Sequence, residues 1–357
     1  MVNGASSLAS GNQLLAFPSI DLSDGPGAVL AAALALLIVV LLTPPLIRKM
    51  HAGGMVGLDV NKAKKAPVAE LGGIAALFAF SISLSLVVGL QKLIANVAEP
   101  PFLAAISVFF MASMIGLIDD ISDLTQRLKA IAVAFAALPL MLVHLGAPII
   151  DLPFGIQFDF TGDAHLLYWL ILVPIGVTGM SNAMNMSAGY NGLESGQIAV
   201  VSFALLAIGT LRGVTDVANL IFAALFGVSL GLYYFNRFPA RLFIGDIGTL
   251  GLGAAMAAGV VLGHLEFYGV IAIAPAFYEA GATAYYGLRK KNGARKKACQ
   301  SPTIGEDGKL VPPAGAGRYT LAYFLLSKRS MNEKSLVRSL LALYAISGGI
   351  AILLSLL

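Results

Sequence analysis

The sequence carries little charge for its length. Of 357 residues, only 12% are Asp, Glu, Lys or Arg, and 58% are hydrophobic. A soluble globular domain carries about 25% charged residues. A chain with so few charges cannot cover its own surface in water. The composition therefore excludes an ordinary soluble protein and predicts an integral membrane protein.

Cysteine and histidine are also scarce. Cys299 is the only cysteine, which excludes an internal disulfide and a cysteine-based metal site. The four histidines are scattered and form no pair at the spacing of a helical metal site. We expect them to be ordinary polar residues.

Long apolar runs fill most of the chain. A helix needs about 20 apolar residues to cross a bilayer, and ten stretches are candidates. The sequence therefore predicts an all-α, polytopic membrane protein, a bundle of about ten transmembrane helices. Residues 1–27 are expected to be a short non-cytoplasmic leader, and residues 28–357 a single catalytic domain. The predicted spans are 28–47, 71–90, 101–118, 130–150, 166–184, 196–211, 217–235, 247–264, 268–287 and 337–357.

The cations predict the orientation of the bundle. Of the 23 Lys and Arg residues, 21 lie in or beside the loops after spans 1, 3, 7 and 9, and only Lys92 and Arg212 lie on the other side. Cytoplasmic loops carry an excess of Lys and Arg. The odd-numbered loops are therefore expected to be cytoplasmic, with both termini outside. The longest of them, 288–336, is expected to hold a short amphipathic helix near "RYTLAYFLLSKR".

Unusual polar stretches gather in those same loops. They are "GMVGLDVNKAKKAPVAELGG" (54–73), "GLIDDISDLTQRLK" (116–129), "NAMNMSAGYNGLESGQ" (182–197), "NRFPARLFIGDIG" (236–248) and "GLRKKNGARKKACQSPT" (287–303). Five connections that are separate in sequence would thus converge on one face of the bundle. That is the arrangement of a site shared between spans.

Carboxylates at the ends of spans predict the chemistry of this site. Asp119 and Asp120 end one apolar span, and Asp246 begins another. An acid within a membrane helix is costly and needs a counter-charge, which a divalent cation or Lys129 could supply. Oxygen ligands such as Asp246 and Asn185 suit Mg²⁺, which also takes water and substrate phosphates as ligands. The pattern indicates chemistry on a phosphate ester at the membrane surface.

Each feature alone has a simpler interpretation. A charge pair at a span end is commonly a solvated helix terminus, and "NGLESG" alone is a common turn. Glu279, within span 9, is expected to make an interhelical hydrogen bond as a protonated carboxyl. "RKKNGARKK" could equally be a basic patch that attracts anionic lipids. The functional interpretation depends on the features lying together on one face.

Taken together, the motifs are recognisable. "GLIDDISDLTQRLK", "NAMNMSAGYNGLESGQ" and "NRFPARLFIGDIG", in this order, resemble the polyprenyl-phosphate sugar-1-phosphate transferases. "NGLESGQ" and "GLDVNK" resemble most the dolichyl-phosphate N-acetylglucosamine-1-phosphate transferases of eukaryotes and archaea. The resemblance implies a bundle of ten transmembrane helices with a cytosolic site. It also implies transfer of N-acetylglucosamine-1-phosphate from UDP-N-acetylglucosamine to a lipid phosphate, with release of UMP and inhibition by tunicamycin.

The resemblance also assigns roles to residues. By it, Asp246 and Asn185 match the Mg²⁺ ligands. Asp119 and Asp120 match paired aspartates that are proposed to deprotonate or position the lipid phosphate, and Lys129 matches a phosphate-binding lysine. Among substrate-binding residues, Asn191 matches one that hydrogen-bonds uracil, Phe243 one that stacks on it, and Arg289 and Arg295 an arginine motif near the sugar. Asp59, Asn61 and Lys62 belong to the first-loop motif, of which Asp59 and Lys62 are expected to bind substrate.

The general-base role of Asp119 or Asp120 is a hypothesis, since the second pKa of a phosphomonoester is about 6 and the lipid phosphate ionises without much help. Positioning the lipid phosphate is an equally supported role for these aspartates.

The expected partners are UDP-N-acetylglucosamine, a polyprenyl or dolichyl phosphate and membrane lipids, with no nucleic acid. The sequence leaves a homodimer open. An archaeal-type cell membrane is the expected location.

Other functions remain to be distinguished. The loop after span 9 lacks the histidine-rich motif of the bacterial branch, which disfavours the peptidoglycan enzyme, but another UDP-sugar transferase of wall or surface-polysaccharide synthesis stays open. An ion-coupled transporter would place acids near the bilayer midplane, with repeat symmetry. An intramembrane prenyltransferase would carry two motifs like "DDISD", whereas this chain has one, and the longer Asp-rich motif of CDP-alcohol transferases is absent.

Overall fold

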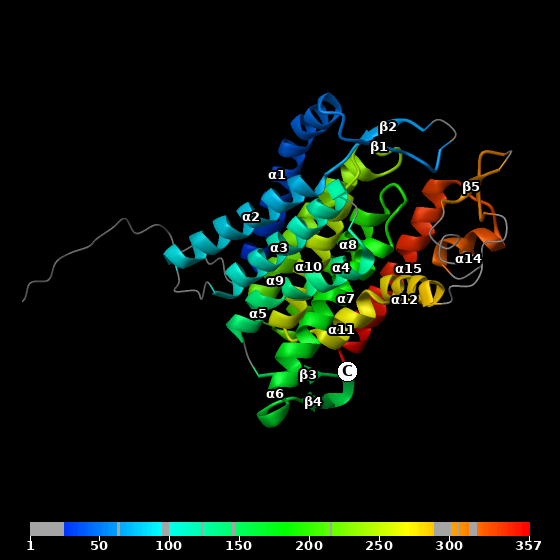
Figure 1. The fold of residues 1–357 in the computed structure, drawn as a ribbon. Helices are drawn as coiled ribbons and strands as arrows, with labels where there is room; N and C mark the ends of the chain where they lie inside the picture. Colours follow the sequence, from blue (N-terminus) through cyan, green and yellow to red (C-terminus); the bar gives the residue numbers. More distant parts are fainter. Residues whose placement is uncertain are drawn as a thin grey trace, which may run out of the picture.

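A computed structural model gives the fold (Figure 1). It describes residues 25–62, 65–94, 100–122, 124–144, 147–214, 216–288, 301–305, 307–313 and 320–357. The leader predicted for residues 1–27 lies almost entirely outside the described residues, as do Arg289 and Arg295.

The protein is a bundle of long helices (Figure 1). Within the described part of the chain, eight helical segments are long and apolar enough to cross a membrane, which confirms the predicted all-α, polytopic class. They are α1 (Gly25–Ala52), α2 (Gly73–Ile94), α3 (Pro100–Ser122), the run Gly162–Met186 that ends with α7 (Val173–Met186), α8 (Leu193–Arg212), α9 (Asp216–Asn236), α10 (Gly245–Leu262) and α15 (Glu333–Leu354).

The two other predicted spans are broken, so the count of ten is not confirmed. The stretch predicted at 130–150 forms two short helices, α4 (Gln126–Phe135) and α5 (Leu138–Val143). The stretch predicted at 268–287 forms α11 (Glu266–Ala272) and α12 (Ala274–Leu288). Pro139 and Pro275 lie at the start of each second helix, and proline has no N–H to continue the helix before it. Apolar periodicity does not reveal such breaks.

The fourth span is irregular for a similar reason. It begins with η2 (Gly162–Ala164) and α6 (His165–Leu167), passes through a π-helical turn, η3 (Tyr168–Leu172), and continues as α7. Pro174 near the start of α7 removes one backbone donor, and a wider turn just before it is a common way to relieve that loss.

Short elements close the two ends of the bundle. Three two-stranded antiparallel sheets pair Val56 with Ala69, Ile149 with Asp159, and Thr303 with Val311. The amphipathic helix predicted near "RYTLAYFLLSKR" is confirmed for its described residues as α14 (Leu321–Lys328). The strands are β1 (Val56–Leu58), β2 (Pro67–Ala69), β3 (Ile149–Asp151), β4 (Gln157–Asp159), β5 (Thr303–Ile304) and β6 (Leu310–Val311), and η1 (Pro153–Gly155) joins β3 to β4.

Helix α10 forms the centre of the bundle. Its membrane-spanning window is 89% buried, against 22% for α1, so α1 faces outward and α10 packs on all sides. Its sequence, "GDIGTLGLGAAMAAGVVL", is rich in small residues, which let neighbouring helices approach closely. A Cβ at Gly253 would lie 2.8 Å from the backbone of Ser181 in α7. This close approach holds the middle of α10 against α7. The first turn of α10 lies beside the ends of α3 and α7, at what we call the site end of the bundle.

Gly116 of α3 sets the position of the site. A Cβ there would overlap the backbone of Asp246 at the start of α10. Asp119 and Asp120 follow one turn later on α3. The absence of a side chain at Gly116 therefore places the carboxylates of α3 beside the first turn of α10.

We expect Gly116→Ala to push α3 away from α10 and to lower the free energy of unfolding by about 1–3 kcal/mol, as overpacking does. Gly89→Ala in α2 is the matched control, because a Cβ there meets nothing within 4 Å. Thermal unfolding in detergent measures both. Equal unfolding temperatures for the two variants would contradict the close approach of α3 and α10.

Candidate active site

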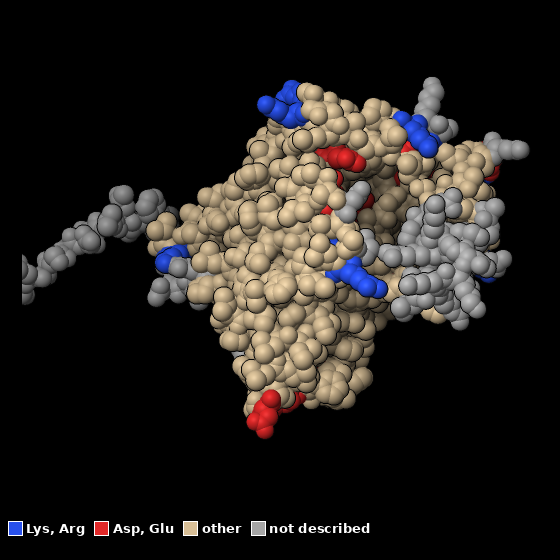
Figure 2. Space-filling model, viewed as in Figure 1, with Lys and Arg blue, Asp and Glu red and all other residues tan. Residues whose placement is uncertain are grey.

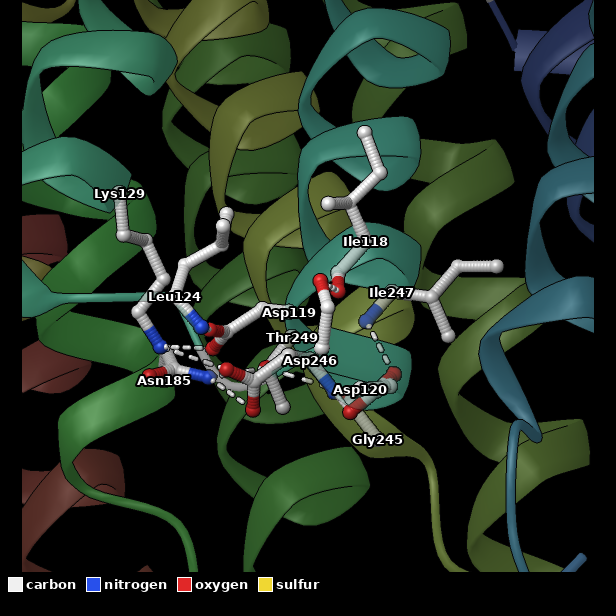
Figure 3. Close-up of polar contacts among 11 residues, drawn as sticks. Ile118, Asp119, Asp120, Leu124, Lys129, Asn185, Gly245, Asp246, Ile247 and Thr249 are labelled. Carbon is white, nitrogen blue, oxygen red and sulfur yellow. Dashed lines mark hydrogen bonds and ion pairs between the residues drawn. The ribbon is translucent and has the colours of Figure 1, made fainter.

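Three charged side chains from three helices meet at the site end (Figure 3). The ammonium of Lys129 in α4 lies 2.6 Å from a carboxylate oxygen of Asp119 in α3 and 2.6 Å from one of Asp246 in α10. The side chain of Lys129 is 4% exposed, that of Asp119 11% and that of Asp246 27%. The sequence placed these residues together, and the structure confirms that they touch.

The turn between α3 and α4 brings Lys129 back to Asp119. Thr125 caps α4, with its hydroxyl accepting a hydrogen bond from the backbone N–H of Leu128. Asp119 accepts a second hydrogen bond, 2.7 Å, from the N–H of Leu124 in the turn. One carboxylate therefore fixes both the turn and the lysine that follows it.

Lys129 keeps its charge despite its burial. Burial alone lowers the pKa of this ammonium, but the hydrogen bonds and negative charges of Asp119 and Asp246 outweigh it, so the pKa lies above its ordinary value. Lys129 is thus a fixed positive charge at physiological pH. It is suited to holding a phosphate, which it would meet beside two carboxylates.

We call Lys129, Asp119 and Asp246 the ion triad. Asp120 does not face it. Its two carboxylate oxygens accept hydrogen bonds from the backbone N–H groups of Asp246, 2.8 Å, and Ile247, 3.0 Å (Figure 3). These are orphan donors in the first turn of α10, where a negative charge is favoured. Gly245 has a φ of +74°, and a Cβ there would lie 2.7 Å from Asp120. The glycine of "FIGDIG" therefore makes room for Asp120 as a cap of α10.

Asn185, from the end of α7, completes the group around Asp246. Its amide nitrogen donates to Asp246, 2.7 Å, and to the hydroxyl of Thr249, 2.8 Å. Thr249 was not predicted, although it lies three residues after Asp246 and so shares its helix face. The side-chain oxygens of Asp246 and Asn185 would offer ligands of the kind that Mg²⁺ takes together with phosphates and water. Asn185 would offer its oxygen only after its amide turns.

A second polar cluster joins the first loop to α15; we call it the first-loop cluster. Asp59 forms an ion pair with Lys62 and accepts a 2.8 Å hydrogen bond from the side-chain amide of Asn191. Glu333, at the start of α15, accepts from the backbone N–H of Asn191, 2.9 Å. Asn61 donates to the carbonyl of Gly189, 2.9 Å. The predicted motif residues Asp59, Asn61, Lys62 and Asn191 therefore lie together.

Sequence reasoning missed two acids at the site end. Glu333 is 3% exposed yet lies in the hydrophilic first turn of α15, which reads as an ordinary helix start. Glu70, after β2, lies near Asp120; burial raises its pKa, and the negative charge of Asp120 raises it further. The proximity of these two acids was not predicted, because they are far apart in the sequence.

Glu279 makes an interhelical hydrogen bond, as expected, from α12 to α14. Its carboxylate accepts a 2.7 Å hydrogen bond from the backbone N–H of Leu321, in the first turn of α14. The partner is a backbone N–H in the first turn of α14, so Glu279 also acts as an acceptor that caps that helix, and its predicted protonation stays a prediction. Its position ties α12 to the segment that carries α14.

A cavity of about 330 Å³ lies between these groups. Asn185 lines it on the side of the ion triad, Asn61 on the side of the first-loop cluster, and Glu279, Tyr323 and Tyr344 on the side of the last spans. Figure 2 shows a hollow on the face in view, with acidic side chains at its rim. A polar cavity at the edge of an apolar bundle can hold a charged ligand beside a lipid.

Phe243 does not line this cavity. Its N–H donates to the carbonyl of Ala69, 2.8 Å, and its carbonyl accepts from Gly72, 2.9 Å, so its backbone fastens the loop before α10 to β2. Arg289 and Arg295 lie outside the described residues. The predicted roles of these three residues stay predictions.

Comparison with known proteins identifies the family. A sequence profile described as glycosyl transferase family 4 matches residues 102–264, which include Asp119, Lys129, Asn185 and Asp246. A protein of Saccharolobus solfataricus is 34% identical over 222 residues, 61% of this chain and 66% of its own length. One of Sulfolobus acidocaldarius is 30% identical over 248 residues, 67% of this chain and 72% of its own length. Both are named, provisionally, as UDP-N-acetylglucosamine–dolichyl-phosphate N-acetylglucosaminephosphotransferases.

The bacterial branch is similar as well. The phospho-N-acetylmuramoyl-pentapeptide-transferase of Lactococcus lactis subsp. cremoris is 30% identical over 253 residues, 67% of this chain and 74% of its own length. Relatives from both branches thus match over similar lengths. The predicted resemblance is confirmed: the chain belongs to glycosyl transferase family 4 and is an integral-membrane phosphoglycosyl transferase.

Proposed function

We propose that the protein transfers N-acetylglucosamine-1-phosphate from UDP-N-acetylglucosamine to a polyprenyl phosphate of the dolichyl type, as the first step of lipid-linked oligosaccharide assembly for N-glycosylation. The observation that carries the proposal is the fixed ammonium of Lys129 between Asp119 and Asp246, beside a polar cavity at the ends of the spans. The printed names of the archaeal relatives support the sugar and the lipid.

The reaction exchanges one phosphoanhydride for another. An oxygen of the lipid phosphate attacks the sugar-bearing phosphorus, the bond to the UMP oxygen breaks, and UMP leaves with that oxygen. The main barrier is the repulsion between two anions, so a fixed positive charge lowers it. Lys129 supplies such a charge. We further propose that Asp246 and Asn185 hold Mg²⁺, which would supply electrostatic stabilisation of the transferred phosphoryl group.

We place the reaction on the cytoplasmic side of an archaeal-type cell membrane. The loops at the site end carry most of the Lys and Arg residues, in line with the usual charge bias of cytoplasmic loops. The soluble nucleotide sugar would enter from water through the cavity, and the lipid phosphate would arrive laterally at the ends of the spans.

The direct test is the product. Purified full-length protein is incubated with Mg²⁺, a polyprenyl phosphate and one UDP-sugar at a time, and the lipid extract is analysed by mass spectrometry. We expect UDP-N-acetylglucosamine to yield a lipid-linked pyrophosphate sugar and UMP in equal amounts. A product from another UDP-sugar alone would move the assignment to wall or surface-polysaccharide synthesis. Tunicamycin that fails to compete with UDP-N-acetylglucosamine would argue against the dolichyl branch.

We expect Asp246→Asn to lower turnover by at least about 100-fold, as loss of a key electrostatic group does. Protection of the protein against heat by Mg²⁺ with UDP should be lost in the same variant. Asp163→Asn is the control, because Asp163 is exposed in the short turn η2 at the other end of the bundle. Thermal unfolding with and without both ligands measures the protection. Undiminished protection in Asp246→Asn would remove the metal assignment even if turnover falls.

We expect Asp120→Asn to lower the unfolding temperature and to reduce turnover at least tenfold without changing the shape of the pH–rate profile. An amide can accept only one of the two N–H bonds that Asp120 accepts, and loss of a helix cap costs about 0.5–2 kcal/mol. Unfolding scans and pH–rate profiles of the variant and the wild type measure this. A profile that loses its acidic limb, with stability unchanged, would show that Asp120 is a general base instead.

A further inference from the structure

A second cavity, separate from the one beside Asn185, lies between the end of α9 and the start of α15. Its volume is about 650 Å³, and four cations line it: Arg237, Arg241, Lys334 and Arg338. None of its lining residues is an acid. We call it the basic cavity. The reaction that we propose uses none of these cations.

These four charges have no acidic partner among the residues that the structure describes. Like charges gathered around one cavity repel one another, and the repulsion grows as water is displaced. An anion bound in the cavity would lower the repulsion among the four cations. The basic cavity therefore has the electrostatics of an anion site.

Two of the four cations, Arg237 and Arg241, are held by contacts within the protein. The guanidinium carbons of Arg237 and Arg241 lie 5.3 and 4.9 Å from the ring centroid of Tyr234, a cation–π arrangement. Arg241 also donates to the carbonyl of Tyr234, 3.3 Å. Lys334 and Arg338, four residues apart, share one face of α15. Two pairs of cations from two elements thus line the same space.

The location of the cavity indicates the source of the anion. It lies where two spans end, and two of its three aromatic residues, Tyr234 and Phe238, are 50% and 38% exposed. Aromatic side chains at span ends mark the membrane–water interface, and basic pockets between transmembrane helices at that level bind lipid head groups. We propose that the basic cavity binds the phosphate of an anionic membrane lipid.

The basic cavity shares a wall with the first-loop cluster. Asn191 lines the cavity and donates to Asp59. The ammonium of Lys62 lies 4.7 Å from the ring centroid of Phe238, another lining residue. A lipid phosphate bound here would therefore contact the residues that hold the first loop in place. The proposal itself concerns binding, and it stands independently of the reaction proposed above.

The test compares lipids on the purified full-length protein in a neutral detergent. Native mass spectrometry measures binding of phosphatidylglycerol and of phosphatidylcholine with the same acyl chains. We expect phosphatidylglycerol to bind the wild type more tightly, and Lys334→Gln/Arg338→Gln to weaken its binding about tenfold or more. Lys334→Arg/Arg338→Lys, which keeps both charges, should retain it. Lys328→Gln/Arg329→Gln removes the same charge from exposed positions outside the cavity and should bind as the wild type does.

Inorganic phosphate, titrated by calorimetry in the absence of lipid, distinguishes the source of the anion. Phosphate binding that disappears in Lys334→Gln/Arg338→Gln, together with equal binding of the two lipids, would overturn the lipid and leave a site for a soluble anion. If phosphatidylglycerol binding falls equally in Lys328→Gln/Arg329→Gln, the binding depends on general surface charge and not on the basic cavity, which would overturn the proposal. Binding that no variant changes would overturn the proposal altogether.

Discussion

The ammonium of Lys129 between Asp119 and Asp246 is the interaction on which the site depends. Carboxylates at the ends of membrane spans are costly when they are unpaired, and removal of one partner from a buried ion pair leaves an uncompensated charge. The three residues belong to three helices, so their attraction fixes the ends of α3, α4 and α10 relative to one another. The same arrangement leaves more negative than positive charge at the site. An excess of negative charge at the site is in line with the proposed binding of Mg²⁺ together with the phosphate.

Close packing of backbones makes this ion triad possible. Gly116 lets α3 approach the first turn of α10, and Gly245 leaves room for the carboxylate of Asp120 against the same turn. Asp120 then satisfies two donors that a helix start would otherwise leave unpaired. Because both of its oxygens are occupied in this way, Asp120 is better placed to hold α10 in position than to take a proton from a substrate. Asp119, whose oxygens bond Leu124 and Lys129, is likewise engaged in positioning.

Much of the fold and the site could be predicted from the sequence, for identifiable reasons. Apolar runs predicted the spans, because the bilayer imposes one length on all of them, and acids at span ends predicted the triad, because unpaired charge is rare there. The breaks before Pro139 and Pro275 were missed, since both stretches are long and mostly apolar and membrane helices tolerate proline. Glu333 and the capping role of Glu279 could not be predicted, because each depends on a backbone N–H supplied by a segment far away in the sequence. Local patterns carry no information about such partners.

The first turns of α15 connect the two cavities. Glu333, almost fully buried, bonds the backbone of Asn191 and lies 3.5 Å from the amide of Asn61, which lines the cavity beside the ion triad. The next residue, Lys334, lines the basic cavity, and Arg338 follows one turn later on the same side. The same helix lines both cavities, with Lys334, Val337 and Arg338 at the basic cavity and Leu340 and Tyr344 at the other.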